Sequence, residues 1–387
     1  MNFNHKFKTL SAFSFLAITC ILSADNTDAK LRNLESRISA MESRKSGCMV
    51  NPPARPTQKC DWGGYITIDP LLLKPQENGL EFVVVTNNVG QAASGNPSLF
   101  GRSKIKAPKF KWDWGFRLGV GANLPHDAWD VYLNWTRFRT HHSRHIFAGA
   151  NQLLTPIFVN NENGTLTPLS NPASLSQFAL TNAKSKWQLR FNEIDLEVGR
   201  EFFASKWLVL KPHAGLATAW IRQKDKIGYR NWLNPGGAGT FVSNAFVNMK
   251  NNFWGIGLRG GLDTQWGLTC GFSLFADFAA SFLYGYFDLD HDEFYTYATG
   301  AQVDFFDAKD FFHVDRVITD VILGIRYDYM FCDDRYHLGV QVGWEHHIYW
   351  GQNQFQRFVG TRMPGIFVAN QGDLTLQGFS AEVRFDF

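Results

Sequence analysis

The chain has 387 residues, of which 15% are aromatic and 19% are charged, and its formal net charge is +3. So balanced a charge excludes most nucleic-acid-binding proteins, and the ordinary Gly and Pro content argues against disorder. Mean hydropathy is negative, and no apolar run of about 18 residues follows the amino terminus, which excludes a bundle of membrane-spanning helices. The many aromatic residues are therefore spread along the chain rather than gathered into helical spans.

The amino terminus has the pattern of an export signal. A basic start at Lys6 and Lys8 is followed by a short apolar segment and then by small residues. This order is typical of a secretory signal peptide. We predict that residues 1–29 form the signal peptide, with cleavage after Ala24 or Ala29, and that the mature chain is exported.

Residues 30–61 are expected to form a short periplasmic segment with two parts. The first carries apolar residues at spacings of 3, 4 and 3, which predicts a short helix with a heptad seam; they are Leu31, Leu34, Ile38 and Met41. Because it spans fewer than two heptads, this helix is marginal alone. It either lies on another surface or assists oligomerisation. The second part, rich in Pro and with two Cys, is interpreted as an extended linker.

From residue 62 onward, apolar and polar residues alternate, which predicts β-strands. Long stretches of this kind occur at 110–122, 272–286, 317–329 and 336–350. The clearest alternation is at the carboxyl terminus, where apolar residues from Phe379 to Phe387 alternate with polar ones. Charges on the second face exclude a sandwich core that is apolar on both sides. In a closed membrane barrel, the apolar face of each strand meets lipid and the polar face meets the hydrated interior.

The lengths of the connections predict the topology. Short connections at 124–128, 201–206, 265–269 and 332–335 alternate with long ones at 74–109, 140–186, 223–251, 288–313 and 351–373. This alternation is typical of short periplasmic turns and long external loops. We predict an all-β, transmembrane, antiparallel up-and-down barrel of about ten strands over residues 62–387. Twelve strands is the alternative, if 80–86 or 157–167 adds a hairpin.

The polar phase of these strands gives a set of inward-facing residues. Both signs of charge occur in similar number, so strong ion selectivity is not expected. Glycines in the same phase, such as Gly119 and Gly121, favour a narrow barrel. The charges either only pair and solvate inside a structural barrel or line a conduction path. The candidate lumen-lining residues are Lys111, Asp113, Arg117, Arg190, Arg259, Asp277, Asp320, Arg326, Glu345, Glu382 and Arg384.

Four cysteines remain in the predicted mature chain, and all map to the periplasmic side of this topology. They are Cys48, Cys60, Cys270 and Cys332. An even number of cysteines in an exported protein favours disulfides, within or between subunits. Three pairings stay open, because spacing does not select among them.

Two clusters have the look of metal sites, and we reject both. His141, His142 and His145 lie among arginines, which disfavour a cation. The acidic triplet that begins at Asp288 has the spacing of calcium-loop ligands, but it lacks the glycine and the closing glutamate of that loop. We interpret it as a solvated acidic loop. No phosphate loop, nucleophile elbow or zinc spacing occurs, so we predict no metal, no cofactor and no enzymatic activity.

From residue 112 the chain reads WDWGFRLGVGANLPHDAWDVYLNWTRF, and from residue 63 it reads GGYITIDPLLLKPQENGLEFVV. These motifs resemble the major-outer-membrane-protein-like porins of environmental chlamydiae and the related Legionella major outer membrane protein family. The resemblance covers residues 30–387 and includes the short helix and the cysteines, since chlamydial major proteins are cross-linked by disulfides. It implies a porin but no defined site residues. The predicted strand number is smaller than that usually assigned to the chlamydial major protein.

We therefore predict an outer-membrane porin that allows passive diffusion of small hydrophilic solutes. The alternative is a surface-exposed barrel that acts as an adhesin or structural protein through its external loops. The expected location is the bacterial outer membrane, and the expected partners are its lipid, small hydrophilic solutes and the barrel assembly machinery. The terminal Phe387 resembles the signal that this machinery reads. A homo-oligomer and a host-surface ligand stay open as partners, and no nucleic acid is expected.

Overall fold

A computed structural model describes residue 34 and residues 63–87, 103–124, 129–149, 152–158, 180–205, 207–232, 242–269, 271–297, 299–332, 336–358 and 367–387. The predicted signal peptide lies outside these ranges. So does the segment 30–61, apart from Leu34, which is helical. Within the described ranges, no helix has the length and apolar character needed to cross a membrane.

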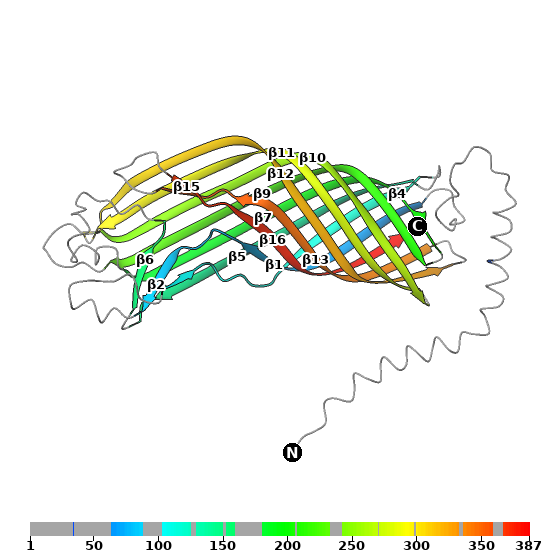
Figure 1. The fold of residues 1–387 in the computed structure, drawn as a ribbon, viewed down its shortest axis with the longest axis horizontal. Helices are drawn as coiled ribbons and strands as arrows, with labels where there is room; N and C mark the ends of the chain where they lie inside the picture. Colours follow the sequence, from blue (N-terminus) through cyan, green and yellow to red (C-terminus); the bar gives the residue numbers. More distant parts are fainter. Residues whose placement is uncertain are drawn as a thin grey trace, which may run out of the picture.

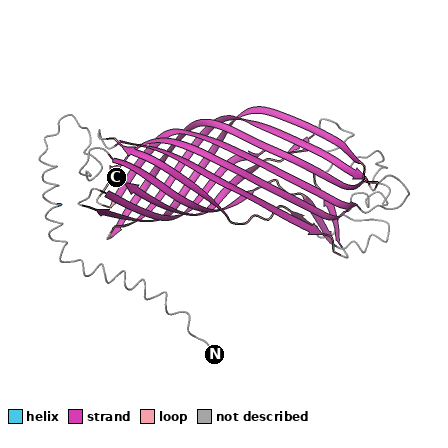
Figure 2. Ribbon diagram, turned by 180° about the vertical axis from the view of Figure 1, so that it is seen from behind, coloured by secondary structure: helices cyan, strands magenta, loops and turns pink. Residues whose placement is uncertain are grey.

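Ten strands form a closed antiparallel ring, because the first and last members of the series, β7 and β9, also pair with each other. The ring confirms the predicted all-β barrel of ten strands, and Figures 1 and 2 show it as an elongated tube. Its strands are β1 (Gly63–Glu77), β4 (Asp113–Asn123), β5 (Trp129–Phe147), β7 (Leu180–Arg200), β9 (Leu208–Trp232), β10 (Val242–Thr269), β11 (Phe272–Tyr297), β12 (Gln302–Phe331), β13 (Tyr336–Asn353) and β16 (Gly372–Asp386).

The remaining strands lie outside the closed ring. Three of them, β2 (Val83–Asn87), β3 (Ser103–Lys106) and β6 (Gln152–Pro156), pair with one another and join the outer end of β7. The short β8 (Phe202–Phe203) pairs with β9, and β14 (Gln356–Phe358) pairs with β15 (Phe367–Ala369). The predicted alternative of twelve strands is therefore wrong. In Figure 1, β2, β6 and β15 lie at the barrel end opposite the carboxyl terminus.

Two predicted long loops are wrong, because strands occupy most of them. Residues 223–251 belong largely to β9 and β10, and residues 288–313 belong largely to β11 and β12. The predicted turn at 265–269 lies inside β10, which ends at Thr269. The strand β12 has 30 residues, whereas a membrane crossing needs about 10. The barrel wall thus continues well beyond the membrane on the side away from the carboxyl terminus.

The polarity of the two faces reverses along several long strands, as β7 shows. Toward the carboxyl-terminal end of the barrel, Leu196 and Val198 are exposed outward while Asp195 is buried inside. Further along, the outward residues are Lys186 and Arg190, and the buried inward ones include large apolar side chains. These inward residues are Trp187, Leu189 and Phe191.

The same reversal occurs on β9 and β10, where Trp220 and Trp254 mark the boundary. Below the boundary, β10 presents Ile256 and Leu258 outward. Above it, Asn248 and Lys250 occupy the outward positions. Since outward apolar residues meet lipid and outward charges meet water, the boundary divides the barrel in two. We call the part with the apolar outer surface the membrane half, and the rest the outer half.

The interior of the outer half is a packed apolar core. Its members come from every side of the ring, so they fill the space across the tube rather than coat a channel wall. The largest fully buried members include Trp187, Tyr229, Phe82, Phe138, Phe158, Phe191, Phe287, Phe355, Leu71, Leu73 and Leu80. The lumen that the sequence predicted to be polar throughout is therefore apolar in this half.

Glycines allow close packing inside the ring. A Cβ on Gly121 would lie 2.1 Å from the Tyr65 ring, and a Cβ on Gly257 would lie 1.7 Å from the Phe282 carbonyl oxygen. These positions match the predicted use of small residues in a narrow barrel. At the seam, the backbone N–H of Phe387 donates to Gly64 O at 2.9 Å, and Gly64 returns the bond at 3.0 Å.

Candidate functional site

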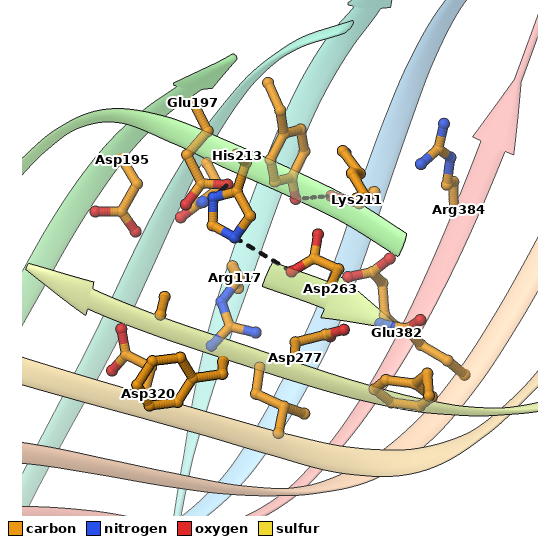
Figure 3. A pocket seen from close by; sticks show the side chains of 18 of the residues that line it. Arg117, Asp195, Glu197, Lys211, His213, Asp263, Asp277, Asp320, Glu382 and Arg384 are labelled. Atoms are coloured by element: carbon orange, nitrogen blue, oxygen red, sulfur yellow. Dashed lines mark hydrogen bonds and ion pairs between the residues drawn. The ribbon is translucent and has the colours of Figure 1, made fainter. Parts of the chain in front are cut away.

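The membrane half contains a cavity of about 190 Å³, which we call the chamber. It is large enough to hold several water molecules. Figure 3 shows charged side chains from many strands pointing into it. The charged and histidine side chains that line it are Arg117, Glu193, Asp195, Glu197, Glu201, Lys211, His213, Arg259, Asp263, Asp277, Asp320, Arg326, His347, Glu382 and Arg384.

A network of ion pairs crosses the chamber, beginning at Arg117 on β4. Arg117 Nη1 lies 2.8 Å from Asp69 Oδ2 on the neighbouring β1. Its two terminal nitrogens also donate to both carboxylate oxygens of Glu345, each at 2.9 Å. Glu345 lies on β13, which two other strands separate from β4 in the ring. Arg117 therefore holds distant parts of the wall together by a bidentate pair, the strongest form of this contact.

His347 continues the network between two carboxylates. Its Nε2 lies 2.9 Å from Glu345 Oε2, and its Nδ1 lies 2.7 Å from Asp320 Oδ1. Since carboxylates only accept hydrogen bonds, both ring nitrogens must carry protons. His347 is therefore an imidazolium that bridges β12 and β13.

Arg259 and His213 complete the crossing. Arg259 donates to Asp320, and its Nε donates to Glu197 Oε1 on β7 at 2.7 Å. His213 lies 3.4 Å from Glu197 Oε2 and 3.2 Å from Asp263 Oδ1, the pair drawn in Figure 3. The network thus runs from β1 to β9. Its ion pairs connect separate parts of the barrel wall across an interior that would otherwise hold only water.

The chamber's charge is unbalanced once these pairs are counted. All five of its Arg and Lys residues make ion pairs with described carboxylates, the remaining ones with Asp130, Asp328 and Asp386. Four of its carboxylates make no ion pair with any described residue. These four are Glu193, Asp195, Asp277 and Glu382.

Two of the unpaired carboxylates, Glu193 and Asp195, lie on β7 near other unsatisfied oxygens. Glu193 accepts the Tyr349 hydroxyl at 3.0 Å through Oε2, but its Oε1 has no hydrogen-bond partner. Asp195 Oδ1 and Asn134 Oδ1 are also buried without one, and strand register places these two residues side by side. Buried acceptors of this kind require water or a positively charged solute. The chamber is therefore suited to water and cations.

No group of three or more His, Cys, Asp or Glu side chains within the described ranges is arranged to hold a metal ion. Strand geometry separates the three histidines that lie close together in the sequence at 141–145. His142 is buried, whereas His141 and His145 are exposed on the other face of β5. Alternation along a strand separates neighbours in this way.

The structure places seven of the predicted lumen residues on the chamber wall, and these are Arg117, Arg259, Asp277, Asp320, Arg326, Glu382 and Arg384. Glu345 belongs to the network beside it. Two assignments are wrong: Arg190 is exposed on the outer surface of β7, and Lys111 is exposed before β4. Arg190 lies above the boundary, where the polar phase faces outward.

Asp113 lies apart from the chamber, at the outer end of β4. It accepts a hydrogen bond from the Thr140 hydroxyl, and its Oδ2 lies 3.3 Å from His142 Nε2. Asp288, Asp290 and Asp292 lie on the outward face of β11, which corrects their assignment to a loop. Of these, Asp290 pairs with Lys250.

Sequence reasoning missed His347, His213 and the acidic series on β7. Glu345 and His347 are two residues apart and face the same way, which is the signal that identifies the pair. The series Glu193, Asp195 and Glu197 follows the same period. The sequence did not identify this series as inward-facing, because apolar residues occupy the same alternate positions earlier on β7.

The predicted disulfides involve residues mostly outside the described ranges. Cys48, Cys60 and Cys270 lie there. Cys332 is described, exposed and free, at a turn residue with φ of 56°. For the other three, a disulfide stays a prediction.

Comparison with known proteins gives one family and a set of barrels. The family model described as the Legionella pneumophila major outer membrane protein precursor matches residues 54–387. The Escherichia coli outer membrane protease OmpT is 12% identical, with 84% of this chain and 96% of OmpT covered and a TM-score of 0.34. The Pseudomonas putida toluene transporter TodX is 11% identical, with 84% and 89% covered and a TM-score of 0.30.

A major outer membrane protein from Thermus thermophilus is 10% identical, with 83% of this chain and 99% of that protein covered and a TM-score of 0.28. Likenesses this weak carry no inference about function. A search of curated proteins found no match to this chain.

Proposed function

The chain belongs to the Legionella pneumophila major outer membrane protein family and is a bacterial outer membrane protein, and we propose that it is a porin for small hydrophilic solutes. Passage would be passive and would need no covalent chemistry or cofactor. The chamber would be the hydrated part of the path. The single observation that supports this proposal is a cavity in the membrane half lined by charged side chains and unsatisfied oxygens.

The unpaired charges favour cations as the transported class. The chamber's arginines and lysine each make an ion pair with a carboxylate, whereas Glu193, Asp195, Asp277 and Glu382 make no ion pair with a described residue. A passing anion would meet uncompensated negative charge in a low-dielectric tube, and a cation would supply the missing partner. This preference replaces the expectation of weak selectivity from equal counts of the two signs.

The apolar core of the outer half is the expected barrier to conduction. Trp187 and Phe191 are fully buried across the path between chamber and exterior. Solutes would cross only when side chains of this core move apart, so the conductance should be small and brief.

The test is single-channel recording of the refolded mature chain in a planar bilayer with a KCl gradient. We expect small steps and a reversal potential that shows cation preference. The double variant Glu193→Gln and Asp195→Asn should reduce that preference several-fold. The matched control, Asp288→Asn with Asp292→Asn, removes two outward carboxylates of the outer half and should leave it unchanged.

A second set of variants tests the barrier. Trp187→Ala with Phe191→Ala should enlarge the steps, because it opens the core. If verified folded barrels conduct in neither the wild-type nor the opened form, the porin proposal fails.

The second candidate is a structural or adhesive surface protein. One observation favours it: the wall and the apolar core extend far beyond the membrane, with β10 running for 28 residues. At about 3.3 Å per residue, such a strand is roughly 90 Å long. Absence of conductance from all the folded barrels would favour this function.

A further inference from the structure

The outward surface of β5, β7 and β9 in the outer half is strongly basic. Strand register places Arg139 beside Arg190 and Arg190 beside Arg222. All three are exposed. Because neighbouring strands are about 4.8 Å apart, the three Cα atoms lie within roughly 10 Å. We call these three residues the arginine row.

More cations lie directly above the arginine row. Register places Lys186 beside Lys226, and Lys224 beside Lys250 of β10. No Asp or Glu occupies an outward position in the described parts of these strands from 137 to 147, 182 to 192, 222 to 230 and 244 to 252. The surface therefore has one sign of charge over four adjacent strands.

Like charges on neighbouring strands destabilise a sheet unless an opposite charge compensates them. The crowding affects Lys224, whose pKa is lowered by partial burial and by nearby Lys226 and Lys250. None of the three arginines makes an ion pair with a described residue. Among the described residues, therefore, none supplies the counter-charge, and an anionic ligand would supply it.

The height of the arginine row identifies the source of that charge. On β9, Trp220 ends the apolar outer surface and Arg222 is the next outward residue. On β5, Trp135 ends it, and Arg139 follows two outward positions later. The row thus lies where the hydrocarbon ends and the lipid headgroups begin. In a bacterial outer membrane, the outer leaflet is a phosphorylated glycolipid.

We propose that the arginine row is a binding site for the phosphate groups of an outer-leaflet glycolipid. Arginine matches phosphate with paired N–H donors and is always charged. The site lies on one side of the barrel, because β11 beyond it presents Asp288, Asp290 and Asp292 outward. Asp290 pairs with Lys250 at the border between the two surfaces. Binding would fix the rotational orientation of the barrel toward its lipids, independently of whether the barrel conducts.

The test measures binding of bisphosphorylated lipid A to the full mature chain, refolded in neutral detergent. The variant Arg139→Gln, Arg190→Gln, Arg222→Gln should bind roughly tenfold more weakly than the wild type. The matched control, Lys104→Gln, Lys309→Gln, Arg357→Gln, removes three exposed cations elsewhere and should bind normally. A cooperative unfolding transition confirms folding, and if the triple variant does not fold, Arg190→Gln alone should weaken binding roughly threefold.

Two further ligands separate the sources of binding. Dephosphorylated lipid A should bind the wild type as weakly as the triple variant binds the intact lipid. Inorganic phosphate at the lipid's concentration should not displace it. Equal binding of lipid A by wild type and triple variant, equal binding of the dephosphorylated lipid, or displacement by inorganic phosphate would each overturn the proposal.

Discussion

The membrane half and the outer half are made by the same ten strands, yet their two faces have opposite polarity. In the membrane half, β7 presents Leu196 to lipid and Asp195 to the chamber. In the outer half, it presents Arg190 outward, beyond the apolar surface, and Phe191 to a packed core. Alternation is conserved along the strand, and only the solvent on each side changes. The period of a pattern therefore identifies a strand, whereas the environment decides which phase is inside.

The difference also separates two means of filling a tube. The outer half excludes water with large apolar side chains, as a soluble domain does. The membrane half cannot place its apolar residues inside, because lipid requires them outside, so it braces its interior with ion pairs such as Arg117 to Glu345. The stability of the outer half should therefore depend on cavities and on carboxylates buried in its core. The stability of the membrane half should depend on charges placed on its lipid-facing surface.

The largest predicted effect is a loss of stability of the outer half as pH rises. Two carboxylates are buried in its core, and burial raises the pKa of Asp225 to about 7 and that of Glu77 to about 8. The unfolded chain ionises both near pH 4. Between pH 4 and pH 8 the folded barrel therefore binds more protons, so its free energy of unfolding falls as pH rises.

Urea unfolding in lipid vesicles at pH 5 and pH 9 measures this effect. For the two groups together, the fall should be on the order of 5 kcal/mol. Asp225→Asn with Glu77→Gln should flatten the profile. Asp288→Asn, which removes an outward carboxylate, should not. An unchanged profile in the double variant would show that other groups carry the dependence.

The strand number and the alternation could be predicted from sequence because lipid-facing residues such as Phe278 and Phe282 recur with period two. The length of the wall could not. Above the boundary, an outward Lys or Asp between inward apolar residues has the same alternation, and the prediction assigned such residues to loops or to the lumen. Arg190 is the clearest case, since its phase was read correctly and its face was reversed.

The candidate site was only partly predictable for a related reason. Arg117, Arg259 and Asp320 could be assigned to the interior from their phase in the membrane half. Their partners could not, because Arg117 reaches Glu345 across two intervening strands. Such contacts depend on barrel diameter and shear, which a single strand's sequence does not encode.

The second effect is a cavity in the outer core. Phe287 is fully buried there, whereas Phe282 on the same strand is exposed to lipid. Phe287→Ala should lower the free energy of unfolding by about 4 kcal/mol, because it removes apolar contacts and leaves a void. Phe282→Ala should cost about 1 kcal/mol, since lipid fills the space. Similar losses in both variants would contradict a packed core above the membrane.

The third effect comes from a charge placed on each outer surface of β7. Leu196→Arg puts a cation against lipid and should cost about 3 kcal/mol. Gln188→Arg puts the same cation on the outer half, where water solvates it, and should cost less than about 0.5 kcal/mol. Unfolding in vesicles measures both. If Gln188→Arg were equally costly, the boundary between the halves would lie higher than the aromatic residues indicate.

The smallest effect is expected for a substitution of Arg190, which should not change the ion selectivity. This arginine lies outside the wall of the outer half, separated from the chamber by the strand and its core. Arg190→Gln should leave the reversal potential in a KCl gradient unchanged. Arg326→Gln is the matched variant on the chamber wall, where it removes a cation that lies 2.8 Å from Asp328 and should increase cation preference. If Arg190→Gln shifted the reversal potential and Arg326→Gln did not, ions would travel along the outer surface rather than through the chamber. The membrane half would then have no role in selectivity.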